Sequence, residues 1–291
     1  MTTVPDAGAP DSRAATVDLH AHSTASDGSL PPAGVVRAAH AAGVAALALT
    51  DHDTLGGVPE AIAAGEALGI RIVPGAELSA TDGEREWHVL ALHIADVPGL
   101  DAKLAVYREA RVRRAREIVD RLVELGMPVL YDDVLAAAGE GAIGRPHIAR
   151  VMVERGFVRD FREAFDRWLG ASRPAFVEKL LVGIGDACAY IHDAGGLAVL
   201  AHPGGAGRRE AIVPLVSAGL DGLEVRHPGH TPEDERRLMI LAAELGLVRS
   251  GGSDWHGARE GNRVLNALRV PQQWLDEQDA LLAARAARTA H

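Results

Sequence analysis

Residues 44–77 read VAALALTDHDTLGGVPEAIAAGEALGIRIVPGAE and contain one complete strand–helix–strand unit. The apolar run at 44–50 predicts a buried strand, residues 58–68 predict a helix that ends at Gly69, and residues 70–74 predict the next strand. Strands that alternate with helices of about a dozen residues are typical of parallel α/β sheets. This stretch therefore indicates an α/β fold with a parallel sheet.

The same alternation continues on both sides of this unit. Further strands are predicted at 17–22, 87–94, 197–201, 222–225 and 247–250. Further helices are predicted at 31–42, 184–194, 209–218 and 232–245, the last with Thr231 as its N-cap. The strand-bearing pieces total about 170 residues, which is short of the roughly 250 of an eight-unit barrel. We therefore expect an α/β fold built as a distorted seven-stranded (β/α)7 barrel.

The pattern changes in the middle of the chain. Residues 101–125 predict a long, charged, amphipathic helix, and shorter helices are predicted at 132–138, 146–156 and 160–169. We expect a discontinuous barrel of residues 16–98 and 183–282, interrupted by an α-helical insertion domain at 99–182. Residues 1–15 are polar and rich in Pro, Ala and Asp, and are expected to form a disordered tail.

Composition narrows the class of protein. The net charge of −10 disfavours the binding of duplex DNA, because a basic face is missing at the global level. The single cysteine, Cys188, excludes an internal disulfide framework. No secretory signal pattern and no uninterrupted run of eighteen apolar residues occur, so we expect a cytoplasmic protein that does not span a membrane. The sequence carries no signal for an oligomeric state.

Metal-ligating side chains gather at the predicted strand ends. His20 and His22 are two residues apart on a strand, so their side chains point the same way, and Asp254 and His256 repeat this spacing. Imidazole and carboxylate pairs are the ligands that borderline divalent metals select. The other predicted strands contribute Glu77, His52, His88 and His202. Because one rim of an α/β barrel collects functional groups, we expect a metal centre there.

Other polar residues near these strands admit two interpretations. Asp18, Asp51 and Asp53 are as well suited to orienting an imidazole or capping the backbone as to direct ligation. The histidines outside the strand ends are interpreted as surface or core residues; they are His40, His93, His192, His230 and His291.

Five motifs together resemble the polymerase-and-histidinol-phosphatase (PHP) family of metal-dependent phosphoesterases. They are DLHAHS at 18–23, TDHDT at 50–54, GAE at 75–77, AHPG at 201–204 and GSDWHG at 252–257. The resemblance implies a distorted seven-stranded barrel and three divalent metal ions, with Mn²⁺ favoured and Zn²⁺ or Fe²⁺ as alternatives. It also implies nine ligands, with Glu77 bridging two metals: His20, His22, Asp27, His52, Glu77, His88, His202, Asp254 and His256.

The helical insertion and the segment GRPHIAR at 144–150 resemble one branch of that family. This branch includes a nucleoside 3′,5′-bisphosphate phosphatase, and some of its members trim RNA from the 5′ end. The resemblance implies a phosphohydrolase that removes the 3′-phosphate of nucleoside 3′,5′-bisphosphates and that also takes short RNA.

The implied chemistry needs no nucleophilic side chain, because clustered divalent ions supply a metal-bound hydroxide near neutral pH. Basic side chains should then bracket the substrate, and Arg145 and Lys179 are the candidates for phosphate contact. His227 lies at a strand end without a place among the ligands, which favours phosphate contact or general-acid catalysis. The arginine-rich run at 108–116 and Arg226 are interpreted as solvated.

Two alternatives remain. A histidinol-phosphate phosphatase, or another small-molecule phosphatase, would use the same metal centre, although the insertion counts against it. A non-catalytic, metal-stabilised module is the alternative from another class, and the complete set of nine ligands opposes it.

Overall fold

The computed structural model describes residues 15–139, 141–257 and 263–289. The strands are β1 Thr16–Ala21, β2 Ala46–Leu49, β3 Arg71–Thr81, β4 Glu86–Leu92, β5 Val182–Gly183, β6 Leu197–Leu200, β7 Gly222–Arg226, β8 Val248–Gly251 and β9 Val270–Pro271. The α-helices are α1 Pro32–Ala41, α2 Val58–Leu68, α3 Val97–Glu124, α4 Tyr131–Ala138, α5 Arg145–Glu154, α6 Phe161–Ala164, α7 Ile184–Asp193, α8 Arg209–Ser217, α9 Pro232–Leu245 and α10 Gln272–Thr289. A short π-helix, Phe165–Leu169, continues α6, and Gly204–Ala206 form a 3-10 turn. The tail expected at 1–15 lies outside the described residues, apart from Ala15.

Two helix boundaries follow from local sequence. Helix α2 ends at Gly69, whose φ of 69° lies in the left-handed region that glycine adopts without a Cβ penalty. Helix α9 begins after Thr231, whose side chain accepts a hydrogen bond from the Asp234 backbone N–H, while Asp234 accepts one from the Thr231 N–H. The predicted N-cap at Thr231 is therefore confirmed.

All the strands of the described residues belong to one barrel-shaped sheet. Eight follow the order β8-β7-β6-β4-β3-β2-β1-β9, and β5 pairs with β3 outside this path. The segment after β8 nearly closes the barrel, because Asp254 N donates to His20 O at 2.8 Å and His22 N donates to Trp255 O at 2.8 Å. The count of nine differs from the expected seven because β5 and β9, of two residues each, are too short to show a period in the sequence.

The sheet is mixed, so the expectation of a parallel sheet is wrong at β4. Only residues 82–85 separate β3 from β4, and a connection this short permits only an antiparallel pair. The side chain of Asp82 shapes this turn by accepting hydrogen bonds from the Glu84 and Arg85 backbone N–H groups, both at 2.9 Å. Strand β4 also runs antiparallel to β6. Its first residues therefore lie at the rim where the neighbouring strands end.

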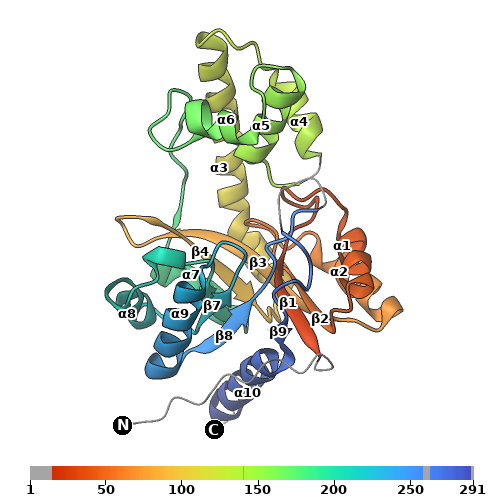
Figure 1. Cartoon of the computed structure of the whole chain (residues 1–291), viewed down its shortest axis with the longest axis vertical. Helices are drawn as coiled ribbons and strands as arrows, with labels where there is room; N and C mark the ends of the chain where they lie inside the picture. The colour runs from red at the N-terminus through yellow and green to blue at the C-terminus, as the bar shows by residue number, and fades with distance from the viewer. Residues whose placement is uncertain (1–14, 140, 258–262, 290–291) are drawn as a thin grey trace.

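Helices cover the barrel on several sides, as Figure 1 shows: α1 and α2 lie on one side, α7, α8 and α9 on the other, and α10 crosses the bottom. Helix α3 runs from the sheet to the top of the view, and α4, α5 and α6 lie beside its upper part (Figure 1). The main core is formed by the strands and the helices that flank them. A second core cluster draws all its buried members from residues 115–177. No helix in the described ranges has both the length and the apolar character that crossing a membrane requires.

Candidate metal centre

The nine residues expected to ligate metal meet at one rim of the barrel. They form four overlapping groups, and within each group the ligand atoms all lie within 4.8 Å of one another. The groups are His22 with Asp27, His52 and His256; His20 with His22 and Asp254; His20 with Glu77 and His202; and His52 with Glu77 and His88. The structure therefore brings all nine together, and these groups contain no other described residue.

Backbone pairing explains how distant segments meet here. Ser79 on β3 pairs with His88 on β4, which places His88 beside Glu77 although the two are eleven residues apart. The chain after β8 approaches β1 closely because residue 252 is glycine. A Cβ at Gly252 would lie 2.4 Å from His20 N, so a side chain there would push the Asp254 segment away from the rim.

Lone-pair atoms converge around His20. Its Nε2 lies 3.1 Å from His22 Nε2 and 3.3 Å from Glu77 Oε2. Asp254 Oδ1 lies 3.4 Å from His20 Nε2 and 3.2 Å from His22 Nε2. Ligands about 2.0–2.1 Å from a tetrahedral metal ion stand about 3.3 Å apart, which matches these spacings. The residues present therefore fit a divalent cation.

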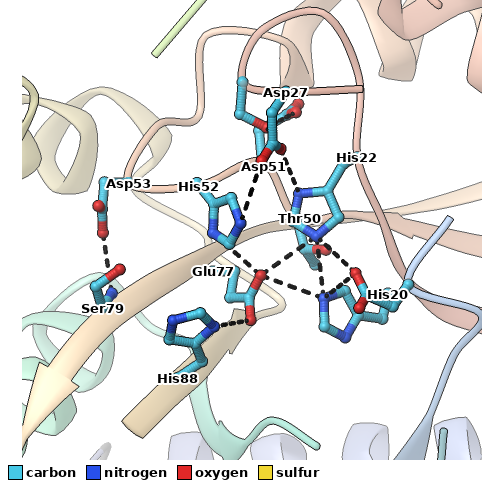
Figure 2. Close-up of polar contacts among 12 residues, drawn as sticks. His20, His22, Asp27, Thr50, Asp51, His52, Asp53, Glu77, Ser79 and His88 are labelled. Carbon is cyan, nitrogen blue, oxygen red and sulfur yellow. Dashed lines mark hydrogen bonds and ion pairs between the residues drawn. The ribbon is translucent and has the colours of Figure 1, made fainter. Parts of the chain in front are cut away.

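Glu77 lies at the middle of the cluster, with imidazoles on several sides (Figure 2). Its Oε2 is 3.2 Å from both His22 Nε2 and His52 Nδ1, and its Oε1 is 2.7 Å from His88 Nδ1. His202 Nε2 lies 2.9 Å from the same Oε1. A carboxylate that offers each oxygen to a different set of imidazoles has the arrangement needed to bridge two cations.

The group around Asp27 is more open. His256 Nε2 lies 3.4 Å from Asp27 Oδ1, His52 Nε2 lies 3.7 Å from Oδ2, and His22 Nδ1 lies 3.9 Å from Oδ1. The last two spacings are too long for hydrogen bonds. His22 Nδ1 is also buried without a hydrogen-bond partner, which is unusual for a ring nitrogen and fits a ligand atom.

The charges of the cluster favour an added cation. Burial opposes ionisation of Glu77, but the nearby His52 and His88 imidazoles hold the pKa of its carboxyl well below the usual range. Burial also disfavours a charged His22, yet hydrogen bonds with Asp254 and Glu77 raise the pKa of its imidazole to about 10. The buried carboxylates thus attract positive charge, which protons supply in the metal-free protein and divalent cations can replace.

Asp18, Asp51 and Asp53 cap backbone and support the ligand loops, and none of them joins the four groups. Asp51 accepts hydrogen bonds from Ser23 N at 2.7 Å and from Ser26 Oγ at 2.6 Å, which organises the loop that carries Asp27. Asp18 accepts one from the Ser253 backbone N–H at 2.9 Å, next to Asp254. Of the two interpretations of these residues, the capping one agrees with the structure.

Positively charged side chains gather beside the metal centre, on the side of α3 and α5. Arg145 lines a cavity of about 350 Å³ together with His88 and His202. Lys179 Nζ donates to Ser79 Oγ and lies 3.0 Å from Glu86 Oε1. Burial, reinforced by the charge of Arg111, lowers the pKa of the Lys179 ammonium to about 8. Positive charges held close together in partly dry surroundings favour the binding of an anion.

The arginine-rich run at 108–116 was expected to face solvent. That expectation is wrong for Arg111 and Arg114, because only 8% of the surface of each residue is exposed. Arg111 Nε donates to Asp53 Oδ2 at 2.7 Å, and Arg114 Nε donates to Val177 O at 2.8 Å. The signal was present in the sequence. Arg111 stands seven residues from both Leu104 and Ile118, on the apolar stripe of the helix.

His227 uses both ring nitrogens inside the protein and is 7% exposed. Its Nδ1 accepts a hydrogen bond from the Gly229 backbone N–H at 3.0 Å, which leaves Nε2–H to donate to Asp254 Oδ2 at 3.1 Å.

The guanidinium of Arg226 donates hydrogen bonds to the backbone carbonyls of Leu268 and Arg269. The interpretation of Arg226 as a solvated side chain is therefore wrong.

The strand-end pattern overlooked one buried residue of the centre, Glu224 on β7. Its carboxylate accepts hydrogen bonds from His20 Nδ1 at 3.0 Å and from the His202 backbone N–H at 2.6 Å. An acidic residue inside the otherwise apolar run GLEV was the available signal.

Comparisons with known proteins agree with this geometry. The family model described as the PHP domain matches residues 18–171. A protein named 5′-3′ exoribonuclease from Haemophilus influenzae is 40% identical over 82% of this chain and 89% of its own length. A 3′,5′-nucleoside bisphosphate phosphatase from Chromobacterium violaceum is 38% identical over 86% of this chain and 90% of its own. A solved structure described as a metal-dependent phosphoesterase from Bifidobacterium adolescentis superposes with a TM-score of 0.84 at 33% identity, covering 91% of this chain and 95% of that one.

Proposed function

Because this chain belongs to the PHP domain family and is a metal-dependent phosphoesterase, we propose that it removes the 3′-phosphate from nucleoside 3′,5′-bisphosphates. The observation that supports this substrate is a positively charged side chain beside the metal centre, because Arg145 lines the same cavity as His88 and His202. A substrate with two phosphates could then present one to the centre and the other to Arg145 and Lys179. The name of the 38% identical relative supports the same substrate.

For the cofactor we propose three divalent cations held by the nine clustered residues, with Mn²⁺ favoured over Zn²⁺ or Fe²⁺. The overlap of the four groups at His20, His22, His52 and Glu77 supports more than one ion. When bound, such cations activate water as a nucleophile and neutralise charge on the phosphoryl group.

The side chains of this chain perform the other tasks. Arg145 and Lys179 bind and orient the second phosphate, which holds the reacting phosphate in place. The hydrogen bonds of His227 to Asp254 and Gly229 favour a positioning role for this imidazole over proton donation to the substrate. Residues 99–182 would act as a substrate cap over a barrel of residues 16–98 and 183–282, a division supported by the separate core at 115–177.

Release of inorganic phosphate from a panel of substrates with added Mn²⁺ tests this function. We expect nucleoside 3′,5′-bisphosphates to be hydrolysed with a higher kcat/KM than nucleoside 3′-monophosphates or histidinol phosphate. Preference for histidinol phosphate would instead establish the alternative phosphatase, and no hydrolysis of any phosphate ester would establish a non-catalytic module.

Arg145→Ala is expected to lower kcat/KM for a 3′,5′-bisphosphate while leaving a simple aryl phosphate nearly unaffected. A charge-assisted hydrogen bond to phosphate contributes about 1.5–3 kcal/mol, or roughly ten- to hundredfold. Arg162→Ala is the matched control, because Arg162 is an exposed arginine of α6. Equal losses on both substrates would show that Arg145 supports the fold or the reacting phosphate instead.

The selectivity for a second phosphate should also depend on pH through Lys179. Its pKa is lowered to about 8, so the ammonium loses its charge as the pH rises through 8. We expect KM for the bisphosphate to increase between pH 7 and pH 9, relative to KM for an aryl phosphate. Lys179→Arg keeps the charge over this range and should flatten the profile. An identical profile in both proteins would remove Lys179 from phosphate recognition.

A second candidate activity, trimming of short RNA from the 5′ end, has its own support. The cavity lined by Arg145 adjoins another of about 650 Å³, and the two share Arg85 and Ala206, so a longer chain could continue beyond the first nucleotide. The 40% identical relative is named for this activity. Release of mononucleotides from a 5′-phosphorylated RNA, but not from its 5′-hydroxyl counterpart, would support it.

A further inference from the structure

Strand β7 contributes none of the nine clustered residues, yet it carries a fully buried carboxylate. Glu224 lies in the middle of β7 with 0% of its surface exposed. An ionised carboxylate in such a place is costly unless each oxygen has a hydrogen-bond donor. The partners of Glu224 therefore show what the residue does.

Each oxygen of Glu224 holds a different residue of the candidate metal centre. Oε1 accepts a hydrogen bond from His20 Nδ1 at 3.0 Å, and Oε2 accepts one from the His202 backbone N–H at 2.6 Å. His20 lies on β1 and His202 follows β6, so one side chain connects two segments that are 182 residues apart in sequence. Glu224 thus spans the rim between them.

The bond to His20 selects a tautomer. An ionised carboxylate only accepts hydrogen bonds, so the Nδ1 of His20 must carry a proton when it faces Glu224. In the neutral imidazole, Nε2 then keeps its lone pair. That atom is the one that faces His22 and Glu77, at 3.1 and 3.3 Å. A carboxylate behind a ligating histidine fixes both ring orientation and ligand basicity.

The bond to His202 holds an unfavourable backbone conformation. His202 has a φ of 31°, in the left-handed region that residues other than glycine seldom adopt. The hydrogen bond from its N–H to Glu224 stabilises this conformation, which directs the imidazole so that Nε2 lies 2.9 Å from Glu77 Oε1.

We propose that Glu224 is a positioning residue that sets the metal affinity of the centre by holding the His20 tautomer and the His202 backbone at once. The proposal rests on the proposed ligand roles of His20 and His202, but not on the identity of the substrate. Metal binding can therefore test it even if the proposed nucleotide substrate is wrong.

The test is Mn²⁺ binding to the metal-free protein by equilibrium dialysis, comparing wild type with Glu224→Gln. Glutamine keeps the size of the side chain but replaces one acceptor oxygen with an NH₂ donor. That donor would face either the His20 Nδ1–H or the His202 N–H, so one of the two bonds is lost in each orientation. We expect Mn²⁺ to bind about ten- to hundredfold more weakly, as is usual when the outer partner of a ligating histidine is removed.

Asp221→Asn is the matched control. Asp221 is a buried carboxylate that directly precedes β7, at the end away from the metal centre, and it accepts hydrogen bonds from the Ala198 backbone N–H and from Arg285. Its substitution also removes a buried negative charge, yet Mn²⁺ affinity should stay at the wild-type value.

Enzyme activity gives a second readout. The Mn²⁺ concentration for half-maximal activity should rise for Glu224→Gln, with a smaller change in kcat at saturating metal.

Glu224→Asp keeps the test decisive if Glu224→Gln does not fold, as judged by circular dichroism. Aspartate retains the charge but is one methylene shorter, so it reaches one partner at most. Its Mn²⁺ affinity should therefore also be lower than that of the wild type. Wild-type Mn²⁺ affinity in a folded Glu224→Gln or Glu224→Asp protein would overturn the proposal. So would an equal loss of affinity in Asp221→Asn, since any buried carboxylate would then have the same effect.

Discussion

Asp254→Asn is expected to lower phosphate release by at least roughly 10³-fold, because metal-ion catalysis supplies several kcal/mol of transition-state stabilisation. Asp254 Oδ1 faces His20 and His22, while Oδ2 accepts a hydrogen bond from His227 and forms an ion pair with Arg263 at 2.8 Å. The new NH₂ group would therefore point either at the candidate cation or at two donors. Asparagine is preferred to alanine as the test because Asp254 has a φ of 49°, which asparagine tolerates.

The measurement combines initial rates with metal content by elemental analysis and with circular dichroism. We expect bound metal to fall along with the rate while the spectrum stays that of the wild type. His40→Ala is the control, because His40 is an exposed histidine on α1. Near-normal turnover and metal content in Asp254→Asn would remove Asp254 from the ligand set.

Removal of metal by dialysis against a chelator should abolish turnover and lower the melting temperature. Without cations, Asp27, Glu77 and Asp254 are buried carboxylates surrounded by histidines, at 5%, 1% and 4% exposure. A ligand present at about a thousand times its Kd stabilises a fold by about 4 kcal/mol, which corresponds to a shift on the order of 10 °C for a chain of this size.

Readdition of Mn²⁺ should restore both the rate and the melting temperature, and parallel samples with Zn²⁺ or Fe²⁺ compare the alternative metals. A chelated protein that contains no metal by elemental analysis and still releases phosphate would contradict the proposed chemistry. A melting temperature unaffected by chelation would show that the nine residues do not bind cations that stabilise the fold.

Much of this protein can be predicted from short stretches of sequence. The helices α2 and α9 follow from apolar spacing, a C-terminal glycine and the Thr231 N-cap, all of which act within one or two turns. The clustered residues are also local signals, because His20 with His22, and Asp254 with His256, each follow a two-residue period along an extended segment. The positions of these two pairs at the ends of parallel strands were enough to predict that they meet at one rim.

Other features depend on pairings that no local pattern contains. Strand β3 extends to Thr81 by pairing with β4, which leaves only residues 82–85 for an antiparallel connection. Only this direction makes the beginning of β4, with His88, part of the rim. The two-residue strands β5 and β9 exist only because β3 and β1 pair with them. Periodicity needs several residues, so it cannot detect either.

By itself, the sequence determined the α/β class and the main helices and strands, because these depend on neighbours within a few positions. The nine residues that cluster at one rim were named through the resemblance of its motifs to the PHP family. Only the tertiary structure decided the antiparallel course of β4, the burial of Arg111 and Arg114, and the bonds of His227 and Glu224. Glu224 meets His20 across 204 positions. The partner of a buried charge is selected by burial and by hydrogen-bond geometry in three dimensions, so such contacts are decided only when the barrel closes.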